Sequence, residues 1–114
     1  ELYQALAAAG ADILTIPSAF TQHTGKDHWE PLLRARAIEN QCFVLAPGQF
    51  GRHSETRVSW GKSLIVDPWG TLLAVAPERE SVILARLQKD DLLRVRKNLP
   101  CLSHRRKFQS AFTA

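Results

Sequence analysis

The stretch His28-Trp29-Glu30-Pro31-Leu32-Leu33-Arg34-Ala35-Arg36-Ala37-Ile38-Glu39-Asn40-Gln41, followed directly by Cys42-Phe43-Val44-Leu45-Ala46, decides how this chain folds. Asp27 is a suitable N-cap, so the first part predicts a helix that begins at or shortly after Asp27. Pro31 is tolerated only in the first turn of such a helix, which favours a start one or two residues after the one that Asp27 suggests. The apolar run from Cys42 predicts a buried strand. The rest of the chain is arranged around this helix and strand.

The predicted helix has one apolar face with an arginine in it. At 100° per residue, that face is formed by Trp29, Leu32, Leu33 and Ala37. Arg36 lies in the middle of the face, where an unpaired charge would be costly, so we expect it to pair with a buried carboxylate of Glu30 or Glu39. Arg34 lies one turn after Glu30 and should form only an exposed ion pair.

Length and composition limit the classes of protein. With 114 residues, 45% of them hydrophobic, the chain has room for one globular domain at most. Lys and Arg exceed Asp and Glu by 15 to 11, mostly in the C-terminal part. That excess favours solvated charge on a terminal helix over a site for phosphate or carboxylate. Two distant cysteines, Cys42 and Cys101, have no metal-ligand spacing and fit a reducing compartment.

The chain shows no sign of a membrane segment. No apolar run approaches the roughly 20 residues that cross a bilayer, and no signal-peptide pattern opens the sequence. We therefore expect a soluble intracellular chain that does not bind membranes, with the cytoplasm as its location and the mitochondrion as the alternative. The first residue, Glu1, already lies in a stretch with helical character, which favours the interpretation that this is a piece of a longer protein.

The first half of the chain repeats a helix-then-strand pattern. Residues 1–9 predict a helix that ends at Gly10, and residues 13–16 predict a short buried strand that ends at Pro17. Two such units in succession predict an α/β sheet covered by helices. The loop of residues 18–26 follows the end of the first strand, which is where open α/β sheets bind ligands.

The second half has a different pattern. Residues 63–66 and 71–75, joined by the turn Asp67-Pro68-Trp69-Gly70, predict an antiparallel hairpin, and residues 81–87 predict a third strand. Asp90-Asp91 should cap a short helix over residues 92–96. Residues 52–57 predict a surface loop, and the tail from about residue 108 should be loosely held.

Several kinds of chemistry are excluded by spacing. Gly61-Lys62-Ser63 lacks the earlier glycine of a phosphate-binding loop, and a strand rather than a helix follows it. The same residues lack the second glycine of a nucleophile elbow. The four histidines have no zinc-ligand spacing, so we expect neither a metal nor a cofactor. Apolar neighbours should raise the pKa of Cys42 and leave its thiol inert, and no base is placed beside Cys101. Basic and aromatic residues are not interleaved, so we do not expect nucleic-acid binding.

A set of short motifs is similar to the C-terminal half of the nitrilase superfamily of carbon–nitrogen hydrolases. The motifs cover nearly the whole chain in the family's order: Pro17-Ser18-Ala19-Phe20, Thr24-Gly25, His28-Trp29-Glu30, Leu33-Arg34-Ala35-Arg36-Ala37-Ile38-Glu39-Asn40-Gln41, Gly61-x-Ser63, Ile65-Val66-Asp67-Pro68-Trp69-Gly70 and His104-Arg105-Arg106. Within that superfamily the chain most resembles the branch of deaminated glutathione amidase and ω-amidase. Lys62 departs from the family's usual histidine at its position.

The resemblance implies one half of an α-β-β-α sandwich over residues 1–114. It also implies a cysteine nucleophile, a glutamate base and a lysine that all precede Glu1, so no catalytic residue lies in this chain. Neither Cys42 nor Cys101 matches the family's nucleophile. The resemblance places substrate contacts at Ser18, Ala19, Phe20 and Thr24. It places the scaffold of the site at His28, Trp29, Glu30 and Arg36.

The implied function is hydrolysis of a linear amide through a cysteine thioester. The substrate would be of the deaminated glutathione or 2-oxo-dicarboxylic monoamide type, and the family pairs into homo-oligomers through its helices. The chain alone should be inactive. The alternative is a catalytically dead form that acts as a dimerisation or interaction module.

Overall fold

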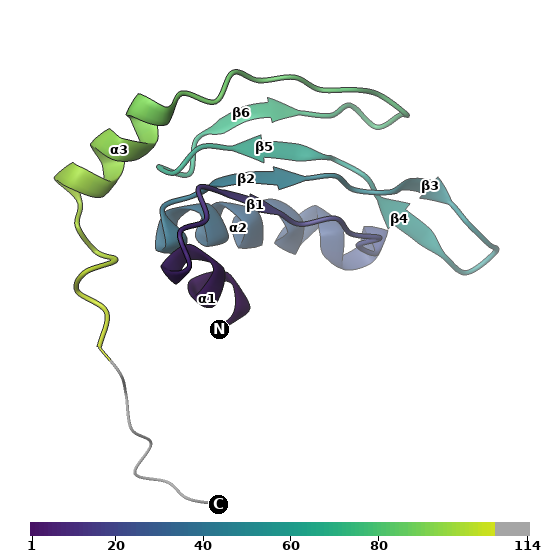
Figure 1. Ribbon diagram of the computed structural model, residues 1–114. Helices are drawn as coiled ribbons and strands as arrows, with labels where there is room; N and C mark the ends of the chain where they lie inside the picture. The colour runs from purple at the N-terminus through teal and green to yellow at the C-terminus, as the bar shows by residue number, and fades with distance from the viewer. Residues whose placement is uncertain (107–114) are drawn as a thin grey trace, which may run out of the picture.

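The computed structural model describes residues 1–106 as a mixed sheet with helices packed against it (Figure 1). The elements, in chain order, are α1 (Leu2–Ala8), β1 (Ile13–Thr15), α2 (Gln22–Asn40), β2 (Phe43–Ala46), β3 (Phe50–Arg52), β4 (Val58–Trp60), β5 (Leu64–Val66), β6 (Leu72–Val75) and α3 (Lys89–Asn98). One sheet has the order β1-β2-β5-β6, in which β1 and β2 are parallel and the other pairs antiparallel. The predicted α/β class is confirmed.

The helix α2 is longer than the sequence predicted. It begins at Gln22 with Thr21 as its N-cap, so the predicted start near Asp27 is wrong. Gly25 lies in its first turn, and a Cβ built there would be only 2.5 Å from the Cβ of Trp60. This close packing of the helix against β4 outweighs the poor helix propensity of glycine. Pro31 lies inside the helix rather than in its first turn.

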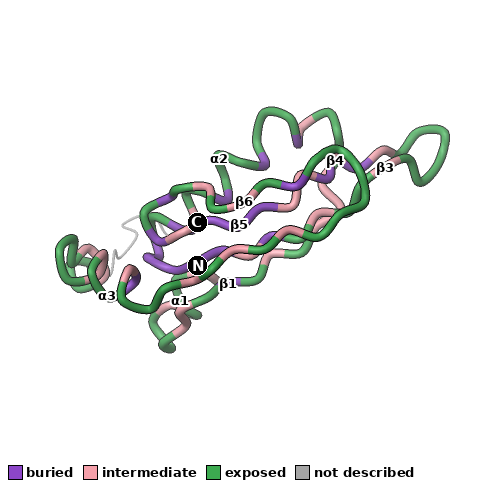
Figure 2. Tube along the Cα trace, turned by 90° about the horizontal axis from the view of Figure 1, so that it is seen from above, coloured by how far each residue is buried: buried purple, intermediate pink, exposed green. Residues whose placement is uncertain are grey.

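One face of the sheet packs against α2, and the core lies between them (Figure 2). Its buried members come from both layers: Leu14, Trp29, Leu33, Ala37, Cys42, Val44, Ala46, Leu64 and Val66. Leu32, which was predicted to share this face of the helix, is 43% exposed. The prediction of a buried strand holds for β2 but not for β1, in which only Leu14 is buried. β1 lies at the edge of the sheet, so its other side chains have fewer neighbours.

The two arginines of α2 differ from the expectation in opposite ways. Arg36 pairs with Glu39 at 2.5 Å as predicted, but both side chains are more than a third exposed, so this carboxylate is not buried. Arg36 also lies over the ring of Tyr3, 5.5 Å from its centroid. Arg34 forms the expected exposed pair with Glu30, and its Nε in addition donates to the carbonyl of Gly70 at 2.9 Å.

The chain between β2 and α3 forms two hairpins. β5 and β6 pair as predicted, and the Asp67 carboxylate accepts hydrogen bonds from the backbone N–H groups of Trp69 and Thr71 in the turn between them. The predicted surface loop of residues 52–57 joins β3 and β4, which form a second hairpin that the sequence did not predict. Its strands have only three residues each.

The chain after β6 departs most from the prediction. Residues 81–87 are extended but form no strand, because nothing in the described chain pairs with them. α3 is longer than predicted and its N-cap is Gln88, with Asp90 and Asp91 in the first turn instead of at the cap. The predicted loosely held tail lies outside the described residues.

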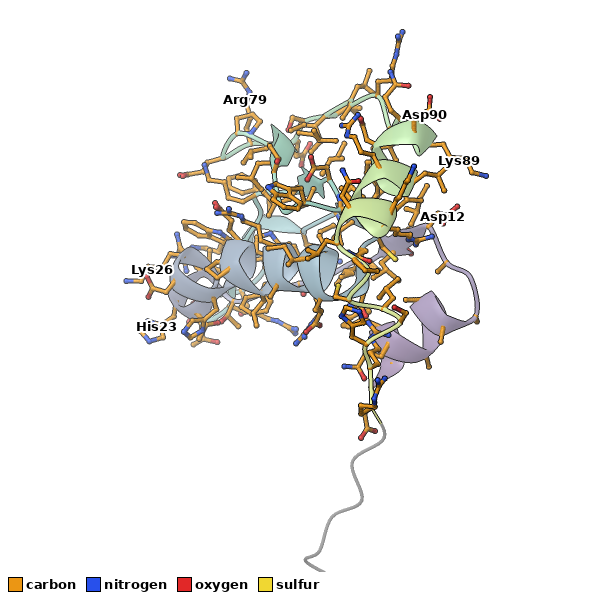
Figure 3. The ribbon with its side chains drawn as sticks, turned by 90° about the vertical axis from the view of Figure 1, so that its left-hand side faces the viewer. Asp12, His23, Lys26, Arg79, Lys89 and Asp90 are labelled. Carbon is orange, nitrogen blue, oxygen red and sulfur yellow. The ribbon has the colours of Figure 1, made fainter. Side chains whose placement is uncertain are left out.

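α3 is joined to the rest of the fold by Arg96. Its guanidinium donates to the carboxylate of Asp12 at 2.8 Å, to the carbonyl of Ala11 at 3.0 Å and to the carbonyl of Gln41 at 3.1 Å. In Figure 3, Asp12 lies beside α3. The Gln41 side chain donates in return to the carbonyl of Leu99 at 2.6 Å. Within the described residues, no helix is long and apolar enough to span a bilayer.

Candidate functional site

The loops that leave β1 and β2 lie side by side. Because β1 and β2 are parallel, both exits occur at the same edge of the sheet. The Ser18 N–H donates to the carbonyl of Pro47 at 3.0 Å, and the Gln49 N–H donates to the carbonyl of Ser18 at 2.9 Å. Gly48 also permits the close approach of the segment after β4, since a Cβ there would lie 2.5 Å from the carbonyl oxygen of Gly61. The predicted ligand loop is therefore one of two that converge.

Phe20 is held firmly in the first of these loops. Its ring packs against Trp29 with the centroids 5.3 Å apart and the planes tilted by 47°. The Trp60 N–H donates to the Phe20 carbonyl at 2.8 Å. The Trp29 indole N–H donates to the carbonyl of Lys62 at 2.8 Å, which ties α2 to the segment after β4. Trp29 therefore contacts the ring of Phe20 and anchors α2 beside it, while its role as a scaffold of the site stays a prediction.

Two adjoining cavities open beside these loops. One, of about 350 Å³, is lined by Tyr3, Ser18, Phe20, Trp29, Leu33 and Arg36, among others. The other, of about 470 Å³, is lined by Pro17, Ser18, Ala19, Pro47, Gly48 and Gln49. Ser18 lines both, so Ser18, Ala19 and Phe20 are brought together as the sequence predicted.

Thr24 is placed differently. It lies in the first turn of α2 and not in the predicted loop, and its hydroxyl is 2.7 Å from that of Thr21. It is half-buried and is not among the residues that line the two cavities. The Thr24 hydroxyl bonds to Thr21 at the start of the helix. A ligand contact of Thr24 would therefore involve a part of the site that lies outside the described residues.

The remaining predicted scaffold residues separate into two groups. Arg36 lines the apolar cavity, where the ring of Tyr3 and the carboxylate of Glu39 hold it. His28 and Glu30 are exposed, and the described contact of Glu30 is its ion pair with Arg34. Figure 3 shows the neighbouring His23 and Lys26 at the same end of α2, pointing away from the fold. The structure therefore brings Trp29 and Arg36 to the site, but not His28 or Glu30.

A third, polar cavity of about 340 Å³ continues from Gly48 and Gln49. It is lined by side chains that the sequence did not assign to a site, among them His53, Lys62, Arg79 and Glu80. The Lys62 ammonium pairs with Glu78 at 3.1 Å, and His53 Nε2 lies 2.8 Å from the Ser59 hydroxyl. The two glycines Gly48 and Gly61 were the only local signal of this close backbone approach. It arises from the unpredicted β3–β4 hairpin.

Neither cysteine lies at these cavities. Cys42 precedes β2, at the opposite end of the strand from Gln49, and is fully buried. Its thiol donates to the carbonyls of Ala11 and Asn40, and burial raises its pKa from the ordinary value of 9.0 despite the nearby Arg96. Cys101 follows α3. The prediction of an inert Cys42 agrees with this environment, and the described residues bring binding groups but no thiol to the site.

Comparisons with known proteins agree on one family. The sequence pattern of the family described as Carbon-nitrogen hydrolase matches residues 1–97. The deaminated glutathione amidase of Rattus norvegicus is 56% identical over 106 residues, which are 93% of this chain and 32% of that protein. The deaminated glutathione amidase of Synechocystis is 51% identical over 105 residues, which are 92% of this chain and 39% of that protein.

Solved structures give the same result for the fold. The NitFhit protein of C. elegans superposes with a TM-score of 0.89 at 47% identity, over 92% of this chain and 26% of that chain. The Nit3 protein of Saccharomyces cerevisiae, described as a member of branch 10 of the nitrilase superfamily, superposes with a TM-score of 0.82 at 34% identity, over 87% of this chain and 36% of that chain. The chain spans about a third of the length of the curated relatives it matches.

Proposed function

This chain belongs to the carbon–nitrogen hydrolase family, and from this premise we propose that it supplies one wall of the active site of an amidase. The observation that carries the proposal is the convergence of the β1 and β2 exits, which places Ser18, Ala19 and Phe20 around two adjoining cavities. This is the edge at which open α/β sheets bind ligands. Its rigid aromatic wall suits a site that must orient a small substrate.

The reaction would proceed by acyl transfer to a thiolate supplied from outside these residues. The thiolate attacks the amide carbonyl, the C–N bond breaks, and the protonated nitrogen leaves as ammonia. Water then attacks the thioester, releases the carboxylic acid and restores the thiolate. Hydrogen-bond donors at the carbonyl oxygen stabilise the charge that develops in both steps. In this proposal residues 1–106 contribute binding and orientation, and the catalytic groups come from outside them.

Within this site the residues have separate tasks. Phe20, held by Trp29 and by the Trp60 N–H, provides an apolar surface that fixes the chain of the substrate. Ala19 and the backbone of Ser18 line the next part of the wall. Thr24 would offer its hydroxyl once its bond to Thr21 is exchanged for one to the ligand. We place the substrate in the class of deaminated glutathione or a 2-oxo-dicarboxylic monoamide, supported by relatives named deaminated glutathione amidase.

A second candidate function is a catalytically dead dimerisation module, favoured by one observation. α1 has no buried residue, and its Leu2 and Leu6 are 67% and 43% exposed; Leu32 of α2, the helix that α1 contacts, is also 43% exposed. An apolar helix face of this kind suits homo-oligomerisation. Sedimentation of the chain and of Leu6→Lys separates the possibilities: dimers that Leu6→Lys dissociates support the module, and a monomer at micromolar concentration excludes it.

The amidase proposal is tested with a chimera. The matched 106 residues of the Rattus norvegicus deaminated glutathione amidase are replaced by this chain, and ammonia release from deaminated glutathione is measured. We expect the chimera to release ammonia. Thiol alkylation should abolish this release, and it should do so also in a chimera in which Cys42 and Cys101 are both replaced by Ala. A folded chimera that releases ammonia from no amide would overturn the proposal.

A further inference from the structure

The polar cavity continues the candidate site along the edge of the sheet. Gly48 and Gln49 line both this cavity and the one formed by Ser18 and Ala19, which in turn shares Ser18 with the apolar cavity. The three cavities therefore lie in series. The proposed function places the amide at the Phe20 wall and uses the first two cavities, so the polar cavity of about 340 Å³ has no role in it. An elongated substrate bound at that wall would extend into it.

Lys62 is the charged group that the polar cavity holds most closely. Its side chain is 28% exposed, whereas the other ionisable residues among the described lining residues, His53, Arg79 and Glu80, are all exposed. The side chain of Arg79 points away from the fold in Figure 3. Lys62 is therefore the cation best placed to meet a ligand inside this cavity.

The backbone at Lys62 is fixed in an unfavourable conformation. Its φ angle is +52°, in the left-handed region that residues other than glycine rarely adopt. The Lys62 carbonyl accepts the indole N–H of Trp29 at 2.8 Å, and the N–H of the preceding Gly61 donates to the carbonyl of Gln49 at 2.9 Å. The surrounding contacts thus hold a lysine where a glycine would fit without strain. Strain that is held in this way is concentrated at functional sites.

The carboxylate that pairs with Lys62 is one that a ligand can replace. The ammonium of Lys62 lies 3.1 Å from Glu78, whose side chain is 63% exposed. An ion pair with so exposed a partner contributes little, because water screens the charges and the side chain has to be ordered. A carboxylate held inside the cavity would therefore exchange for that of Glu78 at small cost, and it would accept a charge-assisted hydrogen bond from Lys62.

We propose that Lys62 binds a carboxylate of the substrate and releases Glu78 when it does so. The proposal rests on the proposed function, because it extends the same site. Deaminated glutathione has a carboxylate at each end, so one end would lie in the polar cavity while the amide lies at the Phe20 wall. Lys62 stands where the family usually has histidine, which is mostly neutral above pH 7. The permanent charge at this position therefore selects anionic substrates in this chain in particular.

The test removes the charge from the protein and from the substrate in turn. The chimera described above and its Lys62→Gln variant are assayed with deaminated glutathione and with each of its two monomethyl esters, and the products are separated by chromatography. Lys62→Gln should lower kcat/KM for the diacid about tenfold and have a much smaller effect on one ester, which identifies the carboxylate that Lys62 binds. Lys62→Arg should restore the value. Glu78→Gln should act in the opposite direction and lower KM for the diacid about threefold, because it removes the competing carboxylate.

The matched control is Arg79→Gln, which removes the same charge from a side chain that points away from the fold. It should leave kcat/KM unchanged for the diacid and for both esters. The proposal is overturned if Lys62→Gln lowers kcat/KM equally for all three compounds, or if Arg79→Gln causes the same loss. A folded chimera that hydrolyses no amide overturns the proposed function, and calorimetric titration of that chimera with deaminated glutathione then tests Lys62 separately. A Kd that rises about tenfold in Lys62→Gln supports the carboxylate site. An unchanged Kd, or no binding to either protein, overturns it.

Discussion

Replacing Arg96 by alanine should detach α3 from the sheet. The guanidinium donates to Asp12, Ala11 and Gln41 and is only 25% exposed, whereas its Asp12 partner is 42% exposed. A hydrogen bond to a charged group contributes about 1.5–3 kcal/mol, and partial exposure lowers that value. The three bonds together should therefore contribute about 2–4 kcal/mol, which is a large part of the stability of a small domain.

Arg94 offers a matched control in the same helix. It is 66% exposed and its one ion pair within residues 1–106 is with Asp91, so Arg94→Ala should cost about 0.5 kcal/mol or less. Urea denaturation of both variants, followed by circular dichroism, measures the difference in the free energy of unfolding. Midpoints that coincide for Arg96→Ala and Arg94→Ala would refute the reasoning, because they would mean that α3 is not held by this arginine.

Three other predictions follow from single contacts. Burial raises the pKa of Cys42 above 9.0, so the thiol loses its proton in the unfolded chain first, and the free energy of unfolding falls as pH rises beyond about 9. Denaturation near pH 8 and near pH 10 should show this fall in the wild type and not in Cys42→Ala. Gly25→Ala should destabilise by about 1–3 kcal/mol, since its Cβ would lie 2.5 Å from the side chain of Trp60, whereas Lys26→Ala, at an exposed position, should be neutral in the same melt. Trp29→Phe keeps an aromatic ring but removes the donor to the Lys62 carbonyl and part of a buried side chain, so it should cost at least about 1 kcal/mol by thermal denaturation, and an unchanged melting temperature would contradict this role of Trp29.

The sequence predicted the elements whose signals are local. The β5–β6 hairpin follows from a turn in which Asp67 bonds its own backbone, and β2 follows from an unbroken apolar run. The loop after β1 was identified as part of a site from topology alone, and the structure places Ser18 and Phe20 at cavities there. These features depend on residues near one another in the chain.

The errors arose where distant residues decide the structure. The start of α2 depends on the contact of Gly25 with Trp60, 35 positions away, which no local pattern contains. The bond from Arg34 to the carbonyl of Gly70 was missed for the same reason. The absence of a strand at residues 81–87 has another cause. Its local signal is that of a strand, but strand formation requires a neighbour, and the described chain does not provide one.

The kinetics of the chimera with and without Phe20 test most directly whether this chain forms the binding wall of an amidase. Phe20→Ala removes the ring that faces the cavity, and Leu93→Ala, at a 50% exposed position on α3, serves as the control. Loss of an apolar wall of this size should lower kcat/KM for deaminated glutathione about tenfold or more, while Leu93→Ala leaves it unchanged. Equal kcat/KM values for Phe20→Ala and the unsubstituted chimera, with both folded, would contradict the account.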